Sequence, residues 1–257
     1  MPRTKKVDTG RRLYFHKAEV EIRVVGPLHA TSPQNPEGVA YMLKHRPTPA
    51  TVAARQAAGA PIIPMNDLAT QVLAETGAEE GKEAMAVFRR HPKDPDKRPF
   101  VHENFIIGHL RDAGEAIARE KGIWGLHSFI SRTLFVRPKA IYLGKPDDQG
   151  QEGPDGQPWP AHYVGSEVLV EEWPTHFDIY RMGRVSSFRR AEFVESPILC
   201  FSVLMTPDPK WTPDLLEDLF FQGSMRGLGG GRGRRMGNYT FTLGEWGQVS
   251  PREAWSL

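Results

Sequence analysis

Three stretches of the chain have hydrophobic patterns that predict β-strands. In residues 19–24, apolar side chains alternate with charged ones, which is the period-two pattern of a half-buried strand. Residues 197–205 form a continuous apolar run, which predicts a central strand buried on both faces. Residues 239–243 alternate again and predict a strand close to the C-terminus.

The clearest helical pattern covers residues 103–121, where apolar residues recur at spacings of three and four. The face that they define contains Phe105, Ile106, Leu110, Ala113, Ile117 and Ala118. Gly122 is placed to end this helix. A second helix is expected to start at Thr212, a favourable N-cap residue that is followed by Pro213. Its apolar face consists of Leu215, Leu216, Leu219 and Phe220.

The remaining patterns are shorter. Strands are predicted at residues 133–136, 140–143, 168–170 and 177–180, and short helices or helical turns at 39–43, 52–60, 67–74 and 82–90. Six prolines interrupt regular structure between residues 31 and 64, residues 91–99 are a predicted loop, and residues 145–160 are predicted to form a mobile hairpin tip or loop. The last third therefore has the order strand, helix, glycine-rich loop, strand, which is half of a ferredoxin-like fold and indicates the α+β class.

The composition is that of a globular protein, since 39% of the 257 residues are hydrophobic and 25% are charged. No stretch approaches the ~18 consecutive apolar residues of a membrane helix, and the basic N-terminus lacks the apolar core of a signal peptide. A cytoplasmic protein without a membrane partner is expected. Cys200 is the single cysteine and the nine histidines are scattered, so no disulfide, metal site or other cofactor is predicted.

Positive charge is concentrated in a glycine-rich stretch near the C-terminus. Residues 223–237, termed the Gly/Arg segment, contain seven glycines and no acidic residue, together with Arg226, Arg232, Arg234 and Arg235. Glycine lets the backbone approach a ligand closely, and guanidinium groups suit phosphate oxygens. The segment follows a helix and lacks a terminal Gly-Lys-Ser/Thr, which argues against dinucleotide and Walker A motifs. Single-stranded RNA is the expected ligand, and a flexible linker is the alternative.

Three segments of the chain together resemble the RAMP superfamily of CRISPR-associated proteins. Residues 25–32 (VGPLHATS) resemble the end of the family's first strand and the loop after it. Residues 105–113 (FIIGHLRDA) resemble the block that leads into the first helix, and residues 215–241 resemble the closing helix, glycine-rich loop and last strand. The resemblance implies an α+β fold with a modified ferredoxin-like, RRM-related core and large insertions.

The resemblance also implies a single RAMP-like domain spanning residues 1–257. Its core is expected at about residues 13–30, 100–144 and 176–246, with insertions at about 31–99 and 145–175. In the family, an insertion after the first strand forms a thumb or finger domain that separates RNA bases, and the first of these insertions would suit that role. Trp159, in the second insertion, is a candidate for stacking on a base or on a neighbouring subunit.

The family member that the chain most resembles is the backbone subunit that coats a guide RNA in an effector complex. The partners implied are the guide RNA, a target nucleic acid paired to the guide, other copies of the chain and other subunits of the complex. The implied RNA-binding residues are His29, Ser32, Arg111, Arg226, Gly229, Gly230, Arg232, Arg234 and Arg235.

Two other functions stay open. A guide-processing endoribonuclease of the same superfamily would use a histidine as general acid or base, and the candidates are His16, His29 and His45. A nucleic-acid-binding or structural protein outside CRISPR systems would use the Gly/Arg segment for a different polyanion or a protein neighbour. Target cleavage, which some backbone subunits perform with an aspartate after the first strand, is not expected, because the only carboxylate in that loop is Glu37.

Overall fold

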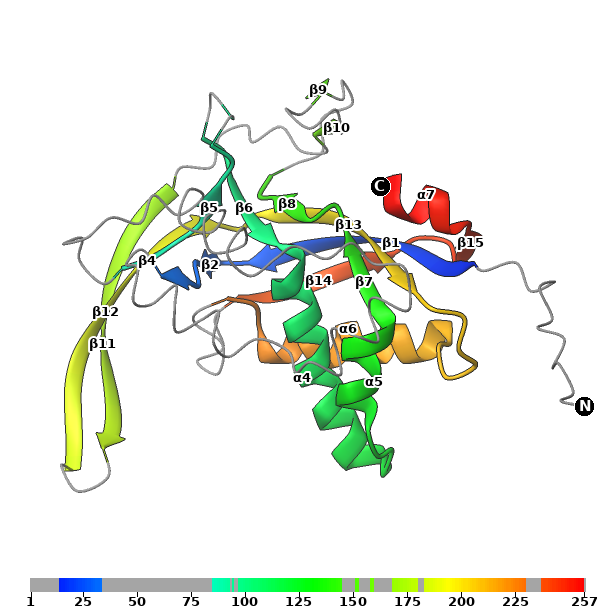
Figure 1. Ribbon diagram of the computed structural model, residues 1–257. Coiled ribbons are helices and arrows are strands. Elements are labelled where there is room, and N and C mark those ends of the chain that lie inside the picture. Colours follow the sequence, from blue (N-terminus) through cyan, green and yellow to red (C-terminus); the bar gives the residue numbers. More distant parts are fainter. Residues whose placement is uncertain are drawn as a thin grey trace, which may run out of the picture.

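The computed structural model describes residues 14–33, 85–92, 94, 97–144, 151–152, 158–159, 168–179, 183–229 and 237–256. Within these residues, helices cover one face of a central antiparallel sheet, and further strands form smaller sheets beside it (Figure 1). The combination of helices with mainly antiparallel sheets confirms the α+β class.

The central sheet contains the strands predicted from the three main hydrophobic patterns. In spatial order its strands are β14 (Asn238–Leu243), β1 (Phe15–Val25), β13 (Ile198–Met205) and β7 (Leu134–Arg137). Neighbouring strands are antiparallel, and β15 (Gly247–Val249) pairs with the first residues of β1. The alternating residues Ala18, Val20, Ile22 and Val24 of β1 belong to the core, which confirms the period-two prediction.

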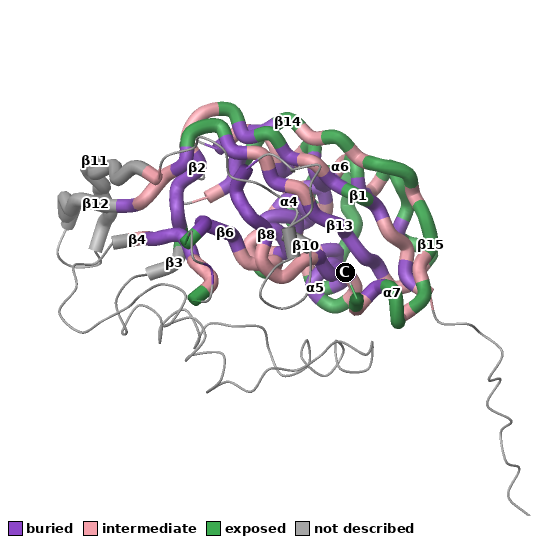
Figure 2. Tube along the Cα trace, turned by 90° about the horizontal axis from the view of Figure 1, so that it is seen from above, coloured by how far each residue is buried: buried purple, intermediate pink, exposed green. Residues whose placement is uncertain are grey.

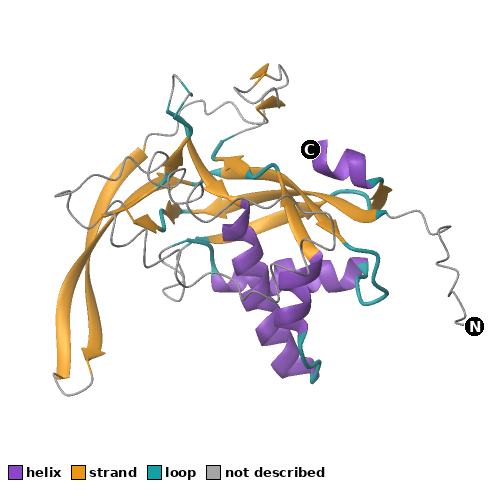
Figure 3. Ribbon diagram, viewed as in Figure 1, coloured by secondary structure: helices purple, strands orange, loops and turns teal. Residues whose placement is uncertain are grey.

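Helices α4 (Glu103–Lys121), α5 (Leu126–Thr133) and α6 (Pro213–Arg226) cover one face of this sheet (Figure 3). α4 has the predicted boundaries, and Gly122 ends it in the left-handed conformation with φ of 67°. The Thr212 hydroxyl accepts a hydrogen bond from the main-chain N–H of Leu215 at 3.1 Å, which confirms the predicted N-cap of α6. α5 was not predicted, because its eight residues are too few for a clear periodicity.

The opposite face of the sheet carries α7 (Pro251–Ser256). The ring of Trp255 packs edge-on against the rings of Phe15 and Phe135, with centroid distances of 5.5 Å and 5.3 Å. Aromatic pairs in this orientation contribute about 0.5–1.5 kcal/mol each beyond the area that they bury. This contact attaches the C-terminal helix to β1 and β7.

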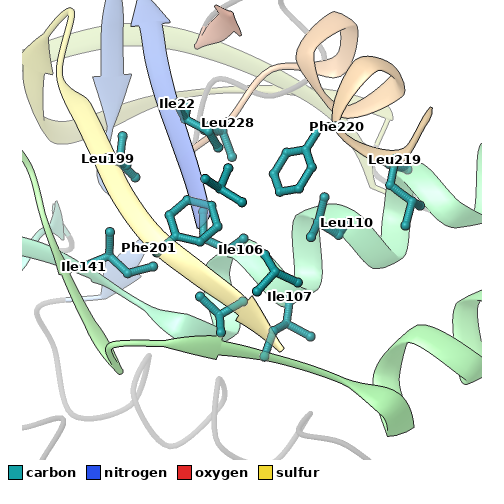
Figure 4. Close-up of a cluster of buried hydrophobic side chains, with 14 of the residues drawn as sticks. Ile22, Ile106, Ile107, Leu110, Ile141, Leu199, Phe201, Leu219, Phe220 and Leu228 are labelled. Atoms are coloured by element: carbon teal, nitrogen blue, oxygen red, sulfur yellow. The ribbon is translucent and has the colours of Figure 1, made fainter. Parts of the chain in front are cut away.

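The main core lies between the central sheet and its helices. Figure 4 shows Ile22 and Phe201 from the sheet facing Leu110 and Phe220 from the helices, with Leu228 beside them. In the view from above, buried positions follow β13 while the outer edge formed by β14 and β15 is largely exposed (Figure 2). Leu228 lies within the Gly/Arg segment, so the core extends to the start of that loop.

A second sheet has the strand order β11 (Val168–Ile179), β12 (Gly183–Glu195), β4 (Met85–Val87) and β3 (Ser32–Pro33), and β2 (Pro27–His29) also pairs with β12. β11 and β12 form a long hairpin that extends away from the central sheet (Figure 1). The other sheets consist of β5 (Arg89–Arg90), β6 (Pro99–His102) and β8 (Ala140–Tyr142), and of β9 (Gln151–Glu152) and β10 (Pro158–Trp159).

One local prediction is wrong, and one pair of predicted strands is longer than expected. Residues 82–90 were expected to form a helical turn, but β4 and β5 occupy most of this stretch, because pairing with neighbouring strands outweighs a weak local preference. The short strands predicted at 168–170 and 177–180 are confirmed as far as residue 179, but they form one continuous strand, β11. Pro174 in its middle is compatible with a strand because β11 lies at the edge of its sheet. The helices expected at 39–43, 52–60 and 67–74 lie outside the described residues.

The chain passes between the central and second sheets at two adjacent points. Gly26, with φ of 80°, separates β1 from β2, and Ser196, with φ of 47°, separates β12 from β13. The main-chain N–H of Ser196 donates to the carbonyl oxygen of Gly26 at 2.9 Å, which holds the two crossings together. None of the helices in the described parts of the chain is both long and apolar enough to span a bilayer.

Candidate nucleic-acid interface

The Gly/Arg segment begins inside a helix rather than as a loop. α6 continues to Arg226, so Gly223 is a helical residue. A Cβ atom at this position would lie 2.4 Å from Nε2 of His109 and 2.5 Å from the hydroxyl oxygen of Tyr239. Gly223 therefore permits close packing between α6, α4 and β14, and the loop proper starts at Gly227, which has φ of 76°.

The two ends of this loop are joined to each other and to the core. The main-chain N–H of Leu228 donates to the carbonyl oxygen of Gly237 at 2.7 Å. The Leu228 side chain is 1% exposed, and burying a leucine contributes about 1.5–3 kcal/mol. The loop is therefore closed at its base by a fixed contact, which is not expected of a flexible linker. Residues 230–236 lie outside the described part of the chain.

Gly229 brings the start of the loop against the residues that follow β1. Its φ is +85°, a conformation that favours glycine, and an added Cβ atom would lie 2.7 Å from the main-chain oxygen of His29. Both constraints require glycine at this position. The close approach fixes the start of the loop beside β2 and Thr31.

A cavity of about 280 Å³ opens at this junction. It is lined by Thr31, Phe105, Gly108, His109, Arg111, Asp112 and Gly229. These residues come from the three sequence segments that carry the family resemblance, which are separated by more than seventy residues in each case. The tertiary structure thus brings all three segments to one place.

Arg111 supplies a cationic group to this cavity. Its Nε atom is buried and has no hydrogen-bond partner among the described residues. A buried donor without a partner costs about 1–3 kcal/mol, and more when the group is charged. An acceptor from a ligand, such as a phosphate oxygen, would remove this cost.

Arg226 lies at the C-terminal end of α6, near the same cavity. Its Nη1 atom donates to the main-chain oxygen of Asp112 at 3.0 Å. This contact leaves the guanidinium group exposed while holding it next to α4. Asp112 directly follows Arg111 in α4, so this bond attaches Arg226 to the residue next to a second predicted arginine.

The other predicted RNA-binding residues are placed as follows. His29 is 1% exposed, and its ring packs against that of Phe193 with a centroid distance of 5.6 Å, so its main chain rather than its imidazole meets Gly229. Ser32 begins β3, next to Thr31, and pairs with Val87 of β4. Gly230, Arg232, Arg234 and Arg235 lie outside the described residues.

The candidate catalytic histidines do not come together in the described structure. His16 is near the start of β1, whereas His29 follows its end. The His16 ring lies 5.1 Å from that of Trp246, and burial lowers the pKa of His16. His45 lies outside the described residues. Within the described residues, no group of three histidine, cysteine, aspartate or glutamate side chains could hold a metal ion.

Several cavity residues were missed by sequence reasoning. Phe105, Gly108, His109 and Asp112 have the spacing i, i+3, i+4 and i+7, which places them on one face of α4. The sequence could have indicated these residues, because they share one helix face within residues 105–113, the segment that contains Arg111. Thr31 could not be found in this way, since its proximity to α4 depends on the crossing between the two sheets.

Neither a protein-family model nor a curated protein matches this sequence. One similar solved structure is described as "Cryo-EM structure of the Type III-B Cmr-beta bound to cognate target RNA". The sequences are 9% identical, the TM-score is 0.42, and the match covers 93% of this chain and 61% of the other. The chain therefore spans less than two thirds of the length of that neighbour. At this level of similarity the function has to be inferred from the residues themselves.

Proposed function

We propose that this protein binds a guide RNA as a repeating subunit of an RNA-guided antiviral complex. The observation that carries the proposal is the meeting of residues 25–32, residues 105–113 and the Gly/Arg segment at one cavity. Each segment resembles a separate part of the RAMP superfamily, and their convergence supports a shared role in binding.

The chemistry of the junction favours a phosphate-bearing chain. The Gly/Arg segment supplies four arginines without an acidic residue, and Arg111 adds a buried donor that lacks a described partner. Guanidinium groups and exposed glycine amides bind phosphate oxygens through charge-assisted hydrogen bonds. Several phosphates in a row, as in single-stranded RNA, would engage more of these groups than an isolated anion would.

We also propose that the core is ferredoxin-like. The elements β1, α4, β7, β13, α6 and β14 follow each other in the order βαββαβ, and the sheet order is β14-β1-β13-β7. The proposed domain is residues 1–257, with the core at about 13–30, 100–144 and 176–246 and insertions at about 31–99 and 145–175. The insertions are the proposed source of contacts with neighbouring copies, with other subunits and with a target paired to the guide.

The RNA-binding part of the proposal is tested by exchanging Arg232, Arg234 and Arg235 for alanine. The probe is a fluorescein-labelled oligouridylate, and affinity is measured by anisotropy at several salt concentrations. The variant should bind more weakly and show a flatter salt dependence, because each lost phosphate contact removes about 0.7 from the slope of log K against log salt for single strands. Arg111→Ala should flatten it further.

A matched control removes three arginine charges elsewhere. Arg119, Arg132 and Arg252 are exposed and lie outside the cavity and the Gly/Arg segment. Their replacement by alanine should leave the salt dependence almost unchanged. If both triple variants behave alike, the Gly/Arg segment is not the binding site.

Sequencing of the RNA that co-purifies with the protein tests whether the bound RNA is a guide. A repeat-derived species supports this part of the proposal, and a heterogeneous pool or no RNA contradicts it.

A further inference from the structure

The outer face of α6 carries two large apolar side chains that the core does not use. Phe221 is 60% exposed and Met225 is 64% exposed, whereas Leu216, Leu219, Phe220 and Gly223 of the same helix are buried. Residues four apart lie next to each other on a helix, so Phe221 and Met225 form one small apolar surface that points away from the central sheet. We term this surface the α6 platform.

The α6 platform adjoins the candidate interface. Met225 directly precedes Arg226, whose guanidinium group is held against the main chain of Asp112. Phe221 is five residues before Arg226, which is about 7.5 Å along the helix axis at 1.5 Å per residue. The two residues are also about 140° apart around the helix, so an RNA strand that continues from Arg226 around the end of α6 would bring a base to the Phe221 ring.

The charges along α6 favour an anionic ligand at this end only. The first half of the helix carries Asp214, Glu217 and Asp218, and Asp218 is bonded to Lys121 of α4. From Leu219 to Arg226 the helix contains no acidic residue and ends in a positive charge. A polyanion would be repelled from the first half and attracted to the second, where the α6 platform lies.

We propose that Phe221, with Met225 beside it, stacks on a base of the RNA whose backbone the Gly/Arg segment binds. This inference rests on the proposed function and adds a contact that backbone binding alone does not require. Proteins that bind single strands commonly combine a cationic path for the backbone with aromatic rings for the bases. The thioether of Met225 is a suitable neighbour, because it is polarizable and contacts π-systems favourably.

The test compares two probes on the full chain. One is the fluorescein-labelled oligouridylate, and the other is a ribose-phosphate oligomer of equal length without bases. Phe221→Ala should weaken binding of the first probe by about 5- to 100-fold, which corresponds to the stacking of one base, and leave binding of the second unchanged. Phe221→Trp should restore binding of the first probe.

Trp124→Ala is the matched control, because Trp124 is 95% exposed and lies in the turn after α4, outside the cavity. It should bind both probes as the unmodified protein does. Equal weakening of both probes by Phe221→Ala, or no weakening of either, would overturn the stacking proposal while leaving the proposed function intact. Failure of the unmodified protein to bind either probe would overturn the proposed function and this inference with it.

A protein partner at the α6 platform would give a different result. If the platform were covered by a second copy, the RNA-free protein would form oligomers in sedimentation, and Phe221→Ala would dissociate them. That outcome, with the affinity for each probe unchanged by the substitution, would also contradict base stacking.

Discussion

The hydroxyl oxygen of Tyr239 lies 2.8 Å from Nε2 of His109 and donates to the main-chain oxygen of Phe220 at 3.1 Å. Three elements meet in this contact: β14, which follows the Gly/Arg segment, α4, which carries Arg111, and α6, whose last residues begin the segment. Because Tyr239 donates its proton to Phe220, its oxygen accepts from His109. Burial raises the pKa of Tyr239, so the hydroxyl keeps this proton at any physiological pH.

Tyr239→Phe removes this hydroxyl while keeping the ring. Nε2 of His109 and the main-chain oxygen of Phe220 each lose one buried hydrogen bond, so the free energy of unfolding should fall by about 1–3 kcal/mol. Urea unfolding monitored by circular dichroism measures the change. Tyr14→Phe is the control. Tyr14 directly precedes β1 and lies away from this contact, so this substitution should change stability much less. Equal stability of the two variants would show that the contact contributes nothing.

Gly229→Ala tests whether the start of the loop needs glycine. Alanine would have to adopt φ of +85° and place a Cβ atom against the main chain of His29, so the loop must move. We expect a loss of about 1–2 kcal/mol in stability and weaker RNA binding. Gly247→Ala is the control, since an added Cβ atom meets nothing within 4 Å there. If Gly229→Ala bound RNA as the unmodified protein does, the conformation of the loop at Gly229 would not be needed to position the RNA.

Glu103→Gln tests a buried ion pair at the start of α4. Nη1 of Arg137 bonds to a carboxylate oxygen of Glu103, both side chains are largely buried, and the Arg137 guanidinium lies 4.7 Å from the centre of the Trp255 ring. Removing one charge leaves the other buried without compensation, which costs about 3–5 kcal/mol. Chemical unfolding measures this loss.

The exposed pair Arg119–Glu115 lies on the same helix and gives a matched control. Glu115→Gln should cost only about 0.3–0.5 kcal/mol, as for other exposed helix pairs. A comparable loss in the two variants would refute the difference that burial is expected to make. Replacing both Glu103 and Arg137 by apolar residues should recover much of the stability lost by Glu103→Gln alone.

The cap of α7 should make stability depend on pH. The Glu253 carboxylate accepts a hydrogen bond from the main-chain N–H of Ser250 at 2.8 Å, and this bond lowers the pKa of Glu253. A group whose pKa is lowered by folding stabilises the folded state above its unfolded pKa of about 4.3, and this contribution is lost as the pH falls through the lower folded pKa.

The measurement is the melting temperature of Glu253→Gln against that of the unmodified protein from pH 7 to pH 3. The variant should melt lower at neutral pH, and the difference should shrink as the carboxylate becomes protonated. Glu245 is exposed and lies in the loop between β14 and β15, so Glu245→Gln should differ little from the unmodified protein in melting temperature at every pH. A difference for Glu253→Gln that stayed constant with pH would contradict this role of the carboxylate.

Local patterns in the sequence were sufficient for the elements that have a clear period or a specific cap. α4 was predicted with its observed boundaries because its apolar spacing and Gly122 agree, and α6 was predicted because Thr212 and Pro213 mark its start. The position of the Gly/Arg segment between a helix and a strand also followed from pattern alone. These features depend on residues close together in the chain, so the sequence displays them directly.

The pairing of strands that are distant in the sequence could not be predicted from local patterns. β4 and β5 are strands because β3, β6 and β12 supply their hydrogen bonds, and β11 is continuous across Pro174 because one of its edges is unpaired among the described strands. Such outcomes depend on partners up to a hundred residues away. Local preference is too weak to reveal them.

The sequence by itself determined which residues are proposed to bind RNA, among them the glycines and arginines near the C-terminus and Arg111 in the first long helix. Only the tertiary structure decided that Gly229 meets His29, that Thr31 reaches α4, and that Phe221 is exposed while its neighbour Phe220 is buried. The physical reason is that charge and backbone freedom are properties of single residues. Adjacency and burial, in contrast, are properties of packing, which arise only when distant segments share one core.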